Sequence, residues 1–155
     1  MPEVTVEELV GTSAEAAYGL VSDVTRMGQW SPETTKCRWL DGAVPTVGAR
    51  FRGANRKEWR RWTTTCTVVA ADPGELFSFD VKVGPLLISR WTYEFISEGS
   101  GCRIRETWID RRPGWMPVVD RTVMGISDRP QHNRETMQAT LTQLGRFVET
   151  GTAGP

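Results

Sequence analysis

The sequence has no surplus of charge of either sign. It holds 19 lysine and arginine residues against 19 aspartate and glutamate residues, so its formal net charge at pH 7 is zero. Proteins that bind nucleic acids or anionic membranes usually carry a strong positive field. We therefore expect no nucleic-acid partner, and any contact with a polyanion must be local.

Long apolar runs are also missing. The first ten residues, MPEVTVEELV, carry acids where a signal peptide needs a basic start, and no segment approaches the roughly 18 apolar residues of a membrane span. We expect a cytoplasmic protein without integral membrane contact. Its 155 residues suffice for one hydrophobic core. We expect a single domain over residues 1–150 and a flexible tail over 151–155.

Metal-binding and nucleophilic motifs are absent as well. The cysteines, Cys37, Cys66 and Cys102, are odd in number and lack CxxC spacing, which favours free, buried thiols. His132 is the only histidine, so there is no HExxH motif or His/Cys cluster, and a place at a helix end is the favoured interpretation. No glycine-rich phosphate loop or nucleophile elbow is present. We expect no metal and no cofactor.

Tryptophan is what the sequence has in excess, with seven residues. Its side chain is large and apolar and has one N–H group that needs a partner when buried. An excess of tryptophan in a small domain is typical of a pocket or an interface, although an ordinary core explains it equally well. The positions of these residues in the predicted elements decide between the two.

The first 32 residues predict a strand and two helical segments. Residues 3–10 alternate weakly and predict a strand. Thr12 followed by Glu15 predicts a capping box for a helix with an apolar face made of Ala16, Ala17, Leu20, Val21 and Val24. Residues 25–30 allow one further turn, which Pro32 must end because the residue before a proline is pushed toward extended geometry.

Residues 34–111 consist of period-two segments separated by turn residues, which is typical of an antiparallel meander. The predicted strands cover residues 34–41, 48–55, 58–71, 75–83, 87–97 and 102–110. A turn at 72–75 sets positions 66, 68 and 70 opposite 81, 79 and 77. A turn at 98–101 sets Phe95, Tyr93 and Trp91 opposite Ile104, Glu106 and Trp108, and a turn at 56–57 sets Phe51 opposite Trp62.

The three turns agree on the two faces of the predicted sheet. Aromatic side chains gather on one face, as expected for a sheet with one face on the core. The other face carries the polar residues Arg50, Arg52, Thr65, Ser78, Asp80, Lys82, Arg90, Glu94, Arg103 and Arg105. After Pro113 a loosely apolar stretch at 115–126 precedes a helix over 129–149. Its inward stripe is Pro130, Asn133, Met137, Leu141, Leu144 and Val148.

Several sequence runs resemble a known family. They are VSDVTRMGQWSP at 21–32, CRWLDG, VGARFRG, ADPG, RWTYEF and RETWIDRRP. Together with the element order, they are similar to the SRPBCC group of the START-like superfamily over about residues 3–148, and more narrowly to small bacterial polyketide cyclase or dehydratase-like proteins. The resemblance implies an α+β helix-grip fold, in which a seven-stranded antiparallel sheet wraps around a long C-terminal helix and encloses a cavity.

We expect this cavity to bind a small hydrophobic molecule, such as a lipid, a polyketide or another aromatic compound. The expected lining is Trp30, Trp39, Phe51, Trp62, Phe77, Phe79, Trp91, Tyr93, Trp108, Met116, Met124, Asn133 and Met137. These residues offer stacking surface and adaptable thioethers but few polar anchors. Asn133 is the better candidate for such an anchor.

Glu106 and Tyr93 are the candidates for chemistry. The alternation places the Glu106 carboxyl group on the apolar face opposite Tyr93, where loss of water raises the pKa of a carboxyl group toward the range of a general base. One hypothesis is a cyclase or dehydratase-type enzyme that uses the two residues as an acid/base pair. The alternative is a structural hydrogen bond from Glu106 to a tryptophan N–H or an arginine.

A basic hairpin carries Arg50, Arg52, Arg56, Lys57, Arg60 and Arg61. A solvated outer face explains such a run. The sharper hypothesis is a contact with an acyl-carrier partner, a lipid surface, or another phosphate or carboxylate group at the pocket mouth, since arginine forks suit these groups. A further alternative is a regulatory module that binds another protein. It needs an exposed apolar patch, against which the polar outer strand positions argue.

Overall fold

The computed structural model describes residues 3–41, 45–115 and 128–151. Along the chain, its elements are β1 (Glu3–Val10), α1 (Ala14–Ser22), η1 (Val24–Gln29), β2 (Thr34–Trp39), β3 (Arg50–Lys57), β4 (Arg60–Asp72), β5 (Leu76–Val83), β6 (Leu86–Glu98), β7 (Gly101–Asp110) and α3 (Arg129–Thr150). Seven strands within these residues form one antiparallel sheet in the order β1-β7-β6-β5-β4-β3-β2.

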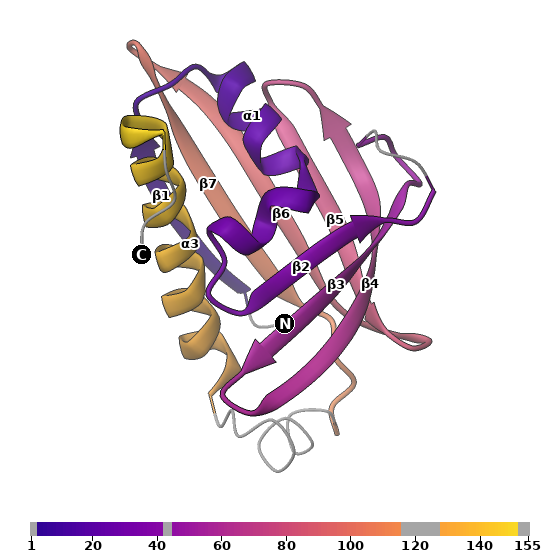
Figure 1. Cartoon of the computed structure of the whole chain (residues 1–155). Coiled ribbons are helices and arrows are strands. Elements are labelled where there is room, and N and C mark those ends of the chain that lie inside the picture. Colours follow the sequence, from indigo (N-terminus) through magenta and orange to yellow (C-terminus); the bar gives the residue numbers. More distant parts are fainter. Residues whose placement is uncertain (1–2, 42–44, 116–127, 152–155) are drawn as a thin grey trace.

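The sheet curves around the helices (Figure 1). Helix α3 runs along β1, while α1 and η1 close the other end of the same inner face. The predicted α+β helix-grip fold is therefore confirmed. No helix in the described part of the chain is long and apolar enough to cross a membrane.

Helix α1 differs from its prediction in its cap and in its buried face. Ser13, and not Thr12, is the N-cap, because the helix begins at Ala14 and the Ser13 hydroxyl accepts a 3.1 Å hydrogen bond from the N–H of Ala16. Ala16 is exposed. The buried residues are Ala14, Ala17, Tyr18, Val21 and Ser22. The ring of Tyr18 covers much more apolar surface than Ala16 can, and this decides which side of α1 faces the core.

Most predicted cross-strand pairs are present. Phe95, Tyr93 and Trp91 lie opposite Ile104, Glu106 and Trp108. Val68 lies opposite Phe79, and Cys66 opposite Val81. The predicted pairing of Ala70 with Phe77 is wrong, because a bulge after Val68 moves Ala70 opposite Ser78.

The β3–β4 hairpin turns later than predicted. Glu58 and Trp59 form the turn, with Glu58 at a φ of 57°. Phe51 therefore pairs with Cys66 and not with Trp62, because this later turn lets every residue of β3 pair with one of β4. The shift is an even number of residues, so each side chain keeps its predicted face.

The outer face of the sheet is tied by ion pairs between neighbouring strands. Arg90 pairs with Asp80 at 2.6 Å, and Arg105 pairs with Glu7 at 2.8 Å. Ser78 departs from the prediction of a solvated position. It is buried, and its hydroxyl bonds to the carbonyl of Trp91 and to the hydroxyl of Thr92.

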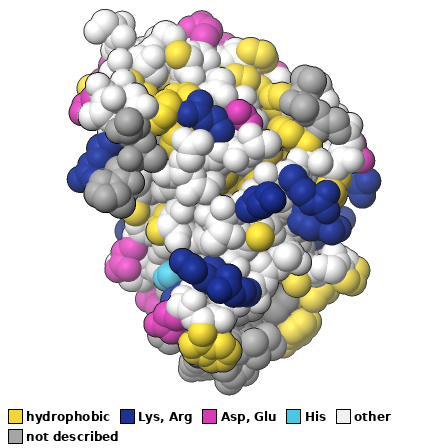
Figure 2. Space-filling view, viewed as in Figure 1, with side chains coloured by type: hydrophobic (Ala, Val, Ile, Leu, Met, Phe, Trp, Pro, Cys, Tyr) yellow, Lys and Arg dark blue, Asp and Glu magenta, His cyan; other side chains and the backbone are white. Residues whose placement is uncertain are grey.

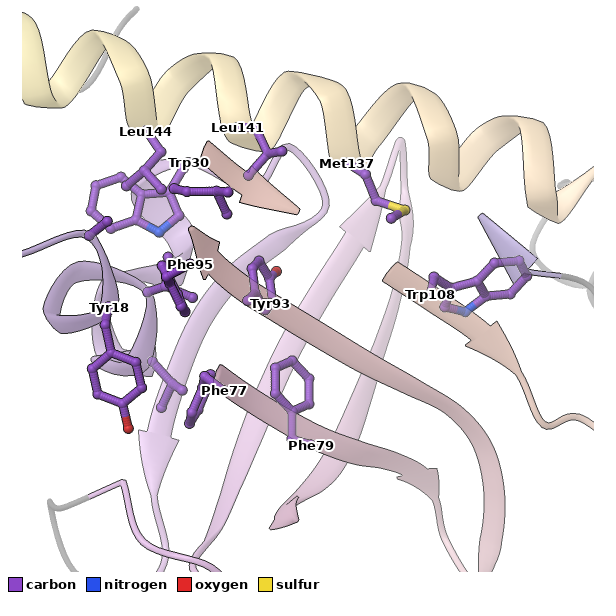
Figure 3. Close-up of a cluster of buried hydrophobic side chains, with 14 of the residues drawn as sticks. Tyr18, Trp30, Phe77, Phe79, Tyr93, Phe95, Trp108, Met137, Leu141 and Leu144 are labelled. Carbon is purple, nitrogen blue, oxygen red and sulfur yellow. The ribbon is translucent and has the colours of Figure 1, made fainter. Parts of the chain in front are cut away.

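Helix α3 carries the predicted inward stripe. Asp128 caps its N-terminus by accepting a hydrogen bond from the N–H of Gln131, and Gly151 ends it with a φ of 74°. The buried members of the stripe are Asn133, Met137, Leu141 and Leu144, and Thr140 joins them. Figure 3 shows Met137, Leu141 and Leu144 pointing from α3 toward the aromatic side chains of the sheet. The predictions for residues 116–126 and 152–155 lie outside the described residues.

Candidate functional site

A cavity of about 190 Å³ lies between the inner face of the sheet and α3. Its apolar wall contains, from the predicted set, Phe51, Trp62, Phe79, Trp91, Tyr93, Trp108 and Met137. Met27, Val81 and Ile88, which the prediction left out, also line it. For comparison, an apolar cavity of about 150 Å³ holds a benzene molecule. The cavity thus has room for a compound somewhat larger than benzene.

Three aromatic residues expected in the lining pack elsewhere. Trp30 lies edge-on against Phe147, Trp39 against Phe51, and Phe77 against Tyr18. Where α1 and η1 cover the sheet, its inner face is filled by such contacts and forms a solid core. Two of these three residues contact residues of the cavity wall, since Trp39 packs against Phe51 and Phe77 against Phe79. Met116 and Met124, also expected in the lining, lie outside the described residues.

More polar residues line the cavity than the one anchor, Asn133, that was predicted. The cavity wall also contains Ser31, Glu33, Thr34, Asn55, Thr64, Ser89, Arg112, Arg129, Asn133, Thr136 and Thr140. Asn133, the anchor that was predicted, is among them and is buried. The strand alternation could have found Asn55 and Thr64, which share the inner face with Phe51 and Cys66. Glu33, Arg112 and Arg129 enter from strand and helix ends, where no periodic pattern applies.

Tyr93 and Glu106 form the central polar pair of this wall. They lie directly opposite each other on β6 and β7, and their exposed fractions are 6% and 1%. The Tyr93 hydroxyl donates a 2.8 Å hydrogen bond to Oε2 of Glu106. The partner of this carboxyl group is thus a tyrosine, and neither the tryptophan N–H nor the arginine considered from sequence. Within the described residues, the buried Oε1 of Glu106 has no hydrogen-bond partner.

Burial controls the protonation of this pair. It raises the pKa of Glu106 to about 8, although the hydrogen bond from Tyr93 acts in the opposite direction. Burial, and then the neighbouring carboxyl group, raise the pKa of Tyr93 well above its ordinary value. At neutral pH the neutral acid is therefore the main form of Glu106. The arrangement offers a proton donor inside an apolar cavity.

Charged residues lie at one end of the cavity. Nε2 of His132 is 2.9 Å from Oε2 of Glu33, and Nη1 of Arg129 is 3.6 Å from Oε1 of the same carboxylate. Arg112, which is 9% exposed, pairs with Asp110 at 2.7 Å. Figure 1 shows the start of α3, the end of β7 and the β3–β4 turn at this same end of the molecule. His132 is thus at a helix end, as expected, and links α3 to the segment before β2.

The thiols near the cavity are not reactive groups. Cys37, Cys66 and Cys102 are all buried and unpaired. Cys37 and Cys66 line the cavity. Burial raises the pKa of the Cys37 thiol to about 12 and also raises the pKa of Cys66. No group of His, Cys, Asp or Glu residues suited to a metal ion occurs in residues 3–41, 45–115 and 128–151.

The basic side chains of the β3–β4 hairpin are not part of the cavity wall. Arg50 binds Asp41 through two nitrogens at 2.8 and 2.9 Å. Arg60 pairs with Glu58 at 3.2 Å, and its guanidinium lies 4.5 Å from the ring centre of Trp59. The remaining arginines, Arg52, Arg56 and Arg61, are exposed. Figure 2 shows Lys and Arg side chains on the face of the molecule that carries β2 and β3.

Comparison with known proteins identifies the family. Residues 1–129 match the family model described as polyketide cyclase / dehydrase and lipid transport. The polyketide cyclase-like protein Cgl2372 of Corynebacterium glutamicum has a solved structure with a TM-score of 0.64 and 30% identity, over 97% of this chain and 95% of that one. No protein of curated function matches the sequence.

Two more distant structures share the fold. The di-domain ARO/CYC BexL from the BE-7585A biosynthetic pathway has a TM-score of 0.66 and 21% identity, over 96% of this chain and 47% of that one. The protein TTHA0849 of Thermus thermophilus has a TM-score of 0.69 and 18% identity, over 98% of this chain and 100% of that one. Since the family model spans most of the sequence, the chain belongs to the polyketide cyclase/dehydrase and lipid transport family.

Proposed function

We propose that the protein binds a small hydrophobic molecule in the cavity between the sheet and α3. The observation that carries the proposal is the cavity of about 190 Å³, with Trp62, Trp91 and Trp108 in its wall and a buried carboxyl group among them. Mostly apolar pockets with a few convergent polar groups are typical ligand sites. The family description, which joins cyclases with lipid transport, agrees with this role.

The size of the cavity favours a compound of one or two rings over a complete lipid. It exceeds only modestly the cavity of about 150 Å³ that holds benzene. A longer ligand has to extend past the charged end at Glu33 and Arg129. Such a ligand would keep its ring system inside and its polar part near these charges.

Native mass spectrometry of the freshly purified full chain, followed by organic extraction, tests this proposal. We expect a copurifying hydrophobic compound, or a complex after one- and two-ring aromatic compounds are added. The mass of the bare chain in both cases, together with unchanged tryptophan emission on addition of these compounds, would contradict it.

A second candidate function is a cyclase or dehydratase-type enzyme, and the Tyr93–Glu106 pair is the observation that favours it. As the neutral acid, Glu106 protonates the leaving hydroxyl group of a bound β-hydroxy ketone; as the carboxylate, it takes the proton from the carbon next to the carbonyl. A general acid or base with a pKa near the working pH suits both steps. In this hypothesis the Tyr93 hydroxyl orients the carboxyl group.

Substitution of Glu106 with Gln distinguishes the enzyme hypothesis from the hypothesis of a ligand-binding protein without catalysis. The enzyme hypothesis predicts that this variant still binds a β-hydroxy aryl ketone but no longer converts it to the enone. The absorbance of the enone measures this dehydration. Conversion at the wild-type rate in the Glu106→Gln protein would remove Glu106 from the chemistry.

The partner and compartment of the protein are part of the proposal. The exposed Arg52, Arg56 and Arg61 fit a contact with an acidic acyl-carrier protein or an anionic lipid surface that delivers the ligand. Replacing these three arginines with Gln is expected to slow ligand delivery from anionic vesicles or from the loaded carrier, with unchanged affinity for the isolated ligand. The three unpaired cysteines favour a reducing compartment such as the cytoplasm.

A further inference from the structure

One oxygen of the Glu106 carboxyl group lacks a partner. Oε2 accepts the hydrogen bond from Tyr93, whereas Oε1 is buried and has no hydrogen-bond partner within the described residues. Buried polar atoms in folded proteins nearly always have a partner, so an exception in a cavity wall marks a place that a ligand atom completes. Glu106 belongs to the cavity wall.

The surroundings of Glu106 decide what that atom must be. A buried carboxylate is stable only beside a cation or with two or three hydrogen-bond donors. Glu106 has a single donor, Tyr93, and forms no ion pair with the described residues. The group is therefore a neutral acid, and its own hydroxyl hydrogen needs an acceptor.

Aromatic side chains surround this position. Trp91 and Trp108 lie opposite each other on the same strands, two residues along from Tyr93 and Glu106. Phe79 stacks on Tyr93 at a centroid distance of 6.5 Å. Figure 3 shows Phe79, Tyr93, Trp108 and Met137 around the same space between the sheet and α3. A planar ring system that enters this space carries its substituents toward Glu106.

We propose that the ligand is an uncharged aromatic or conjugated carbonyl compound, whose carbonyl oxygen accepts a hydrogen bond from Oε1 of Glu106. This inference rests on the proposed function, because it names the class of molecule that the same cavity holds. It disfavours a fatty acid that enters with its carboxylate first, because that anion would be buried beside Glu106 without a cation. It also disfavours an alkyl tail at this position, which leaves the acid without an acceptor.

Matched pairs of ligands test the inference on the full chain. Acetophenone and α-methylstyrene have nearly the same shape, but the C=O group of the first is a C=CH₂ group in the second. The same holds for 2-acetylnaphthalene and 2-isopropenylnaphthalene. The affinity of each compound is measured from the quenching of tryptophan emission. For each protein, the affinity for the ketone is divided by the affinity for the matching alkene. This ratio is then compared between protein variants, because the difference in hydration of the two ligands is the same for all of them and cancels.

The ratio is expected to fall about tenfold in Glu106→Leu, which loses one hydrogen bond to the ligand. It is expected to stay within about threefold in Glu106→Gln, whose amide N–H donates in place of the acid. In the wild-type protein the ratio falls as the pH rises through the pKa of Glu106, and in Glu106→Gln it does not. The pH series needs only these two proteins, so it stands even where Glu106→Leu fails to fold.

Other titratable groups of the cavity have to be separated from Glu106 in the pH series. They are Glu33, Cys37, Cys66, Tyr93, Arg112 and Arg129. Burial raises the pKa of both thiols and of Tyr93, which moves their titration above that of Glu106. All of these groups are retained in Glu106→Gln, so a pH effect that survives in this variant belongs to one of them and overturns the inference.

The outcomes of the two proposals are distinct. Ketones and alkenes that bind with the same ratio in wild type and Glu106→Leu, or a wild-type ratio that does not change with pH, overturn the inference and leave the cavity as a ligand site. If no member of either pair binds the wild-type protein, the proposed function itself fails and the inference fails with it.

Discussion

The hydroxyl group of Tyr93 lies 2.8 Å from Oε2 of Glu106, and this hydrogen bond links β6 to β7 across the inner face of the sheet. The two side chains stand directly opposite each other, and both are buried. Because the other carboxyl oxygen has no partner within the described residues, this bond is the single hydrogen bond of the Glu106 side chain among them.

Removal of the Tyr93 hydroxyl is expected to act on both stability and protonation. Tyr93→Phe leaves the whole carboxyl group without a donor, which costs about 1–3 kcal/mol in the free energy of unfolding by urea. The substitution is also expected to raise the pKa of Glu106 further, because the hydrogen bond from Tyr93 lowers this pKa. A ¹³C NMR titration of the carboxyl group measures the change. Tyr18→Phe is the matched control, because Tyr18 packs on Phe77 and Phe95. An equal pKa change in both variants contradicts this role of Tyr93.

The free energy of unfolding is expected to depend on pH through Glu106. Its pKa is about 8 in the folded chain against an ordinary 4.5, so between these values the folded state holds a proton that the unfolded state has lost. The stability from this proton is complete below about pH 4.5 and is lost as the pH rises through 8. The slope is about 1.4 kcal/mol per pH unit at most.

Glu106→Gln provides the control for this pH dependence. The amide does not titrate, so urea unfolding of this variant between pH 5 and 8 is expected to lack the part of the slope due to Glu106. Identical slopes in the variant and the wild type would show that Glu106 is already charged in the folded protein over this pH range.

Two glycines are expected to respond in opposite directions to the same substitution. A Cβ atom at Gly28 would lie 2.6 Å from the carbonyl oxygen of Thr35, so Gly28→Ala must push η1 away from β2. We expect a loss of about 1–3 kcal/mol in stability. Gly19 lies in α1 with nothing within 4 Å of such an atom. Gly19→Ala is expected to add about 0.5–1 kcal/mol. Equal effects on the thermal midpoint would contradict the packing of η1.

Substitutions of two tryptophans distinguish ligand binding in the cavity from binding at the surface. Trp91 lines the cavity, whereas Trp59 is 76% exposed at the β3–β4 turn. In proteins with wild-type circular dichroism, Trp91→Ala is expected to weaken the binding of 2-acetylnaphthalene about tenfold or more, and Trp59→Ala less than about threefold. Unchanged affinity in a folded Trp91→Ala protein would refute the assignment of this wall.

Much of the fold is predictable from sequence because its strands obey one physical rule. Alternating polar and apolar residues must place one face of a half-buried sheet in water. That rule alone places Tyr93 opposite Glu106 once the 98–101 turn is known. The positions of the β3–β4 turn and of the bulge after Val68 are not encoded in the alternation. Moving the partner of Phe51 from Trp62 to Cys66 leaves every side chain on its predicted face. Both registers therefore agree with the alternation, and the pattern cannot choose between them.

The site was less predictable than the fold. Periodicity gives the inner face, but it does not say where that face is hollow and where it is filled. Trp30 and Phe77 belong to the filled part because α1 and η1 cover it, which requires the packing of three elements at once. Glu33, Arg112 and Arg129 come together only because strand and helix ends meet at one end of the sheet. No local pattern in the sequence predicts that these strand and helix ends lie together.

The central claim is that the cavity between the sheet and α3 is the ligand site, and the seven tryptophan indole N–H signals test it directly. In a ¹H–¹⁵N NMR titration with 2-acetylnaphthalene, the account predicts that the signals of Trp62, Trp91 and Trp108 move, because these residues line the cavity. The signals of the exposed Trp59 and Trp115 should stay in place. Saturable binding that moves the signals of Trp59 and Trp115 and leaves the three cavity signals unchanged would contradict the account.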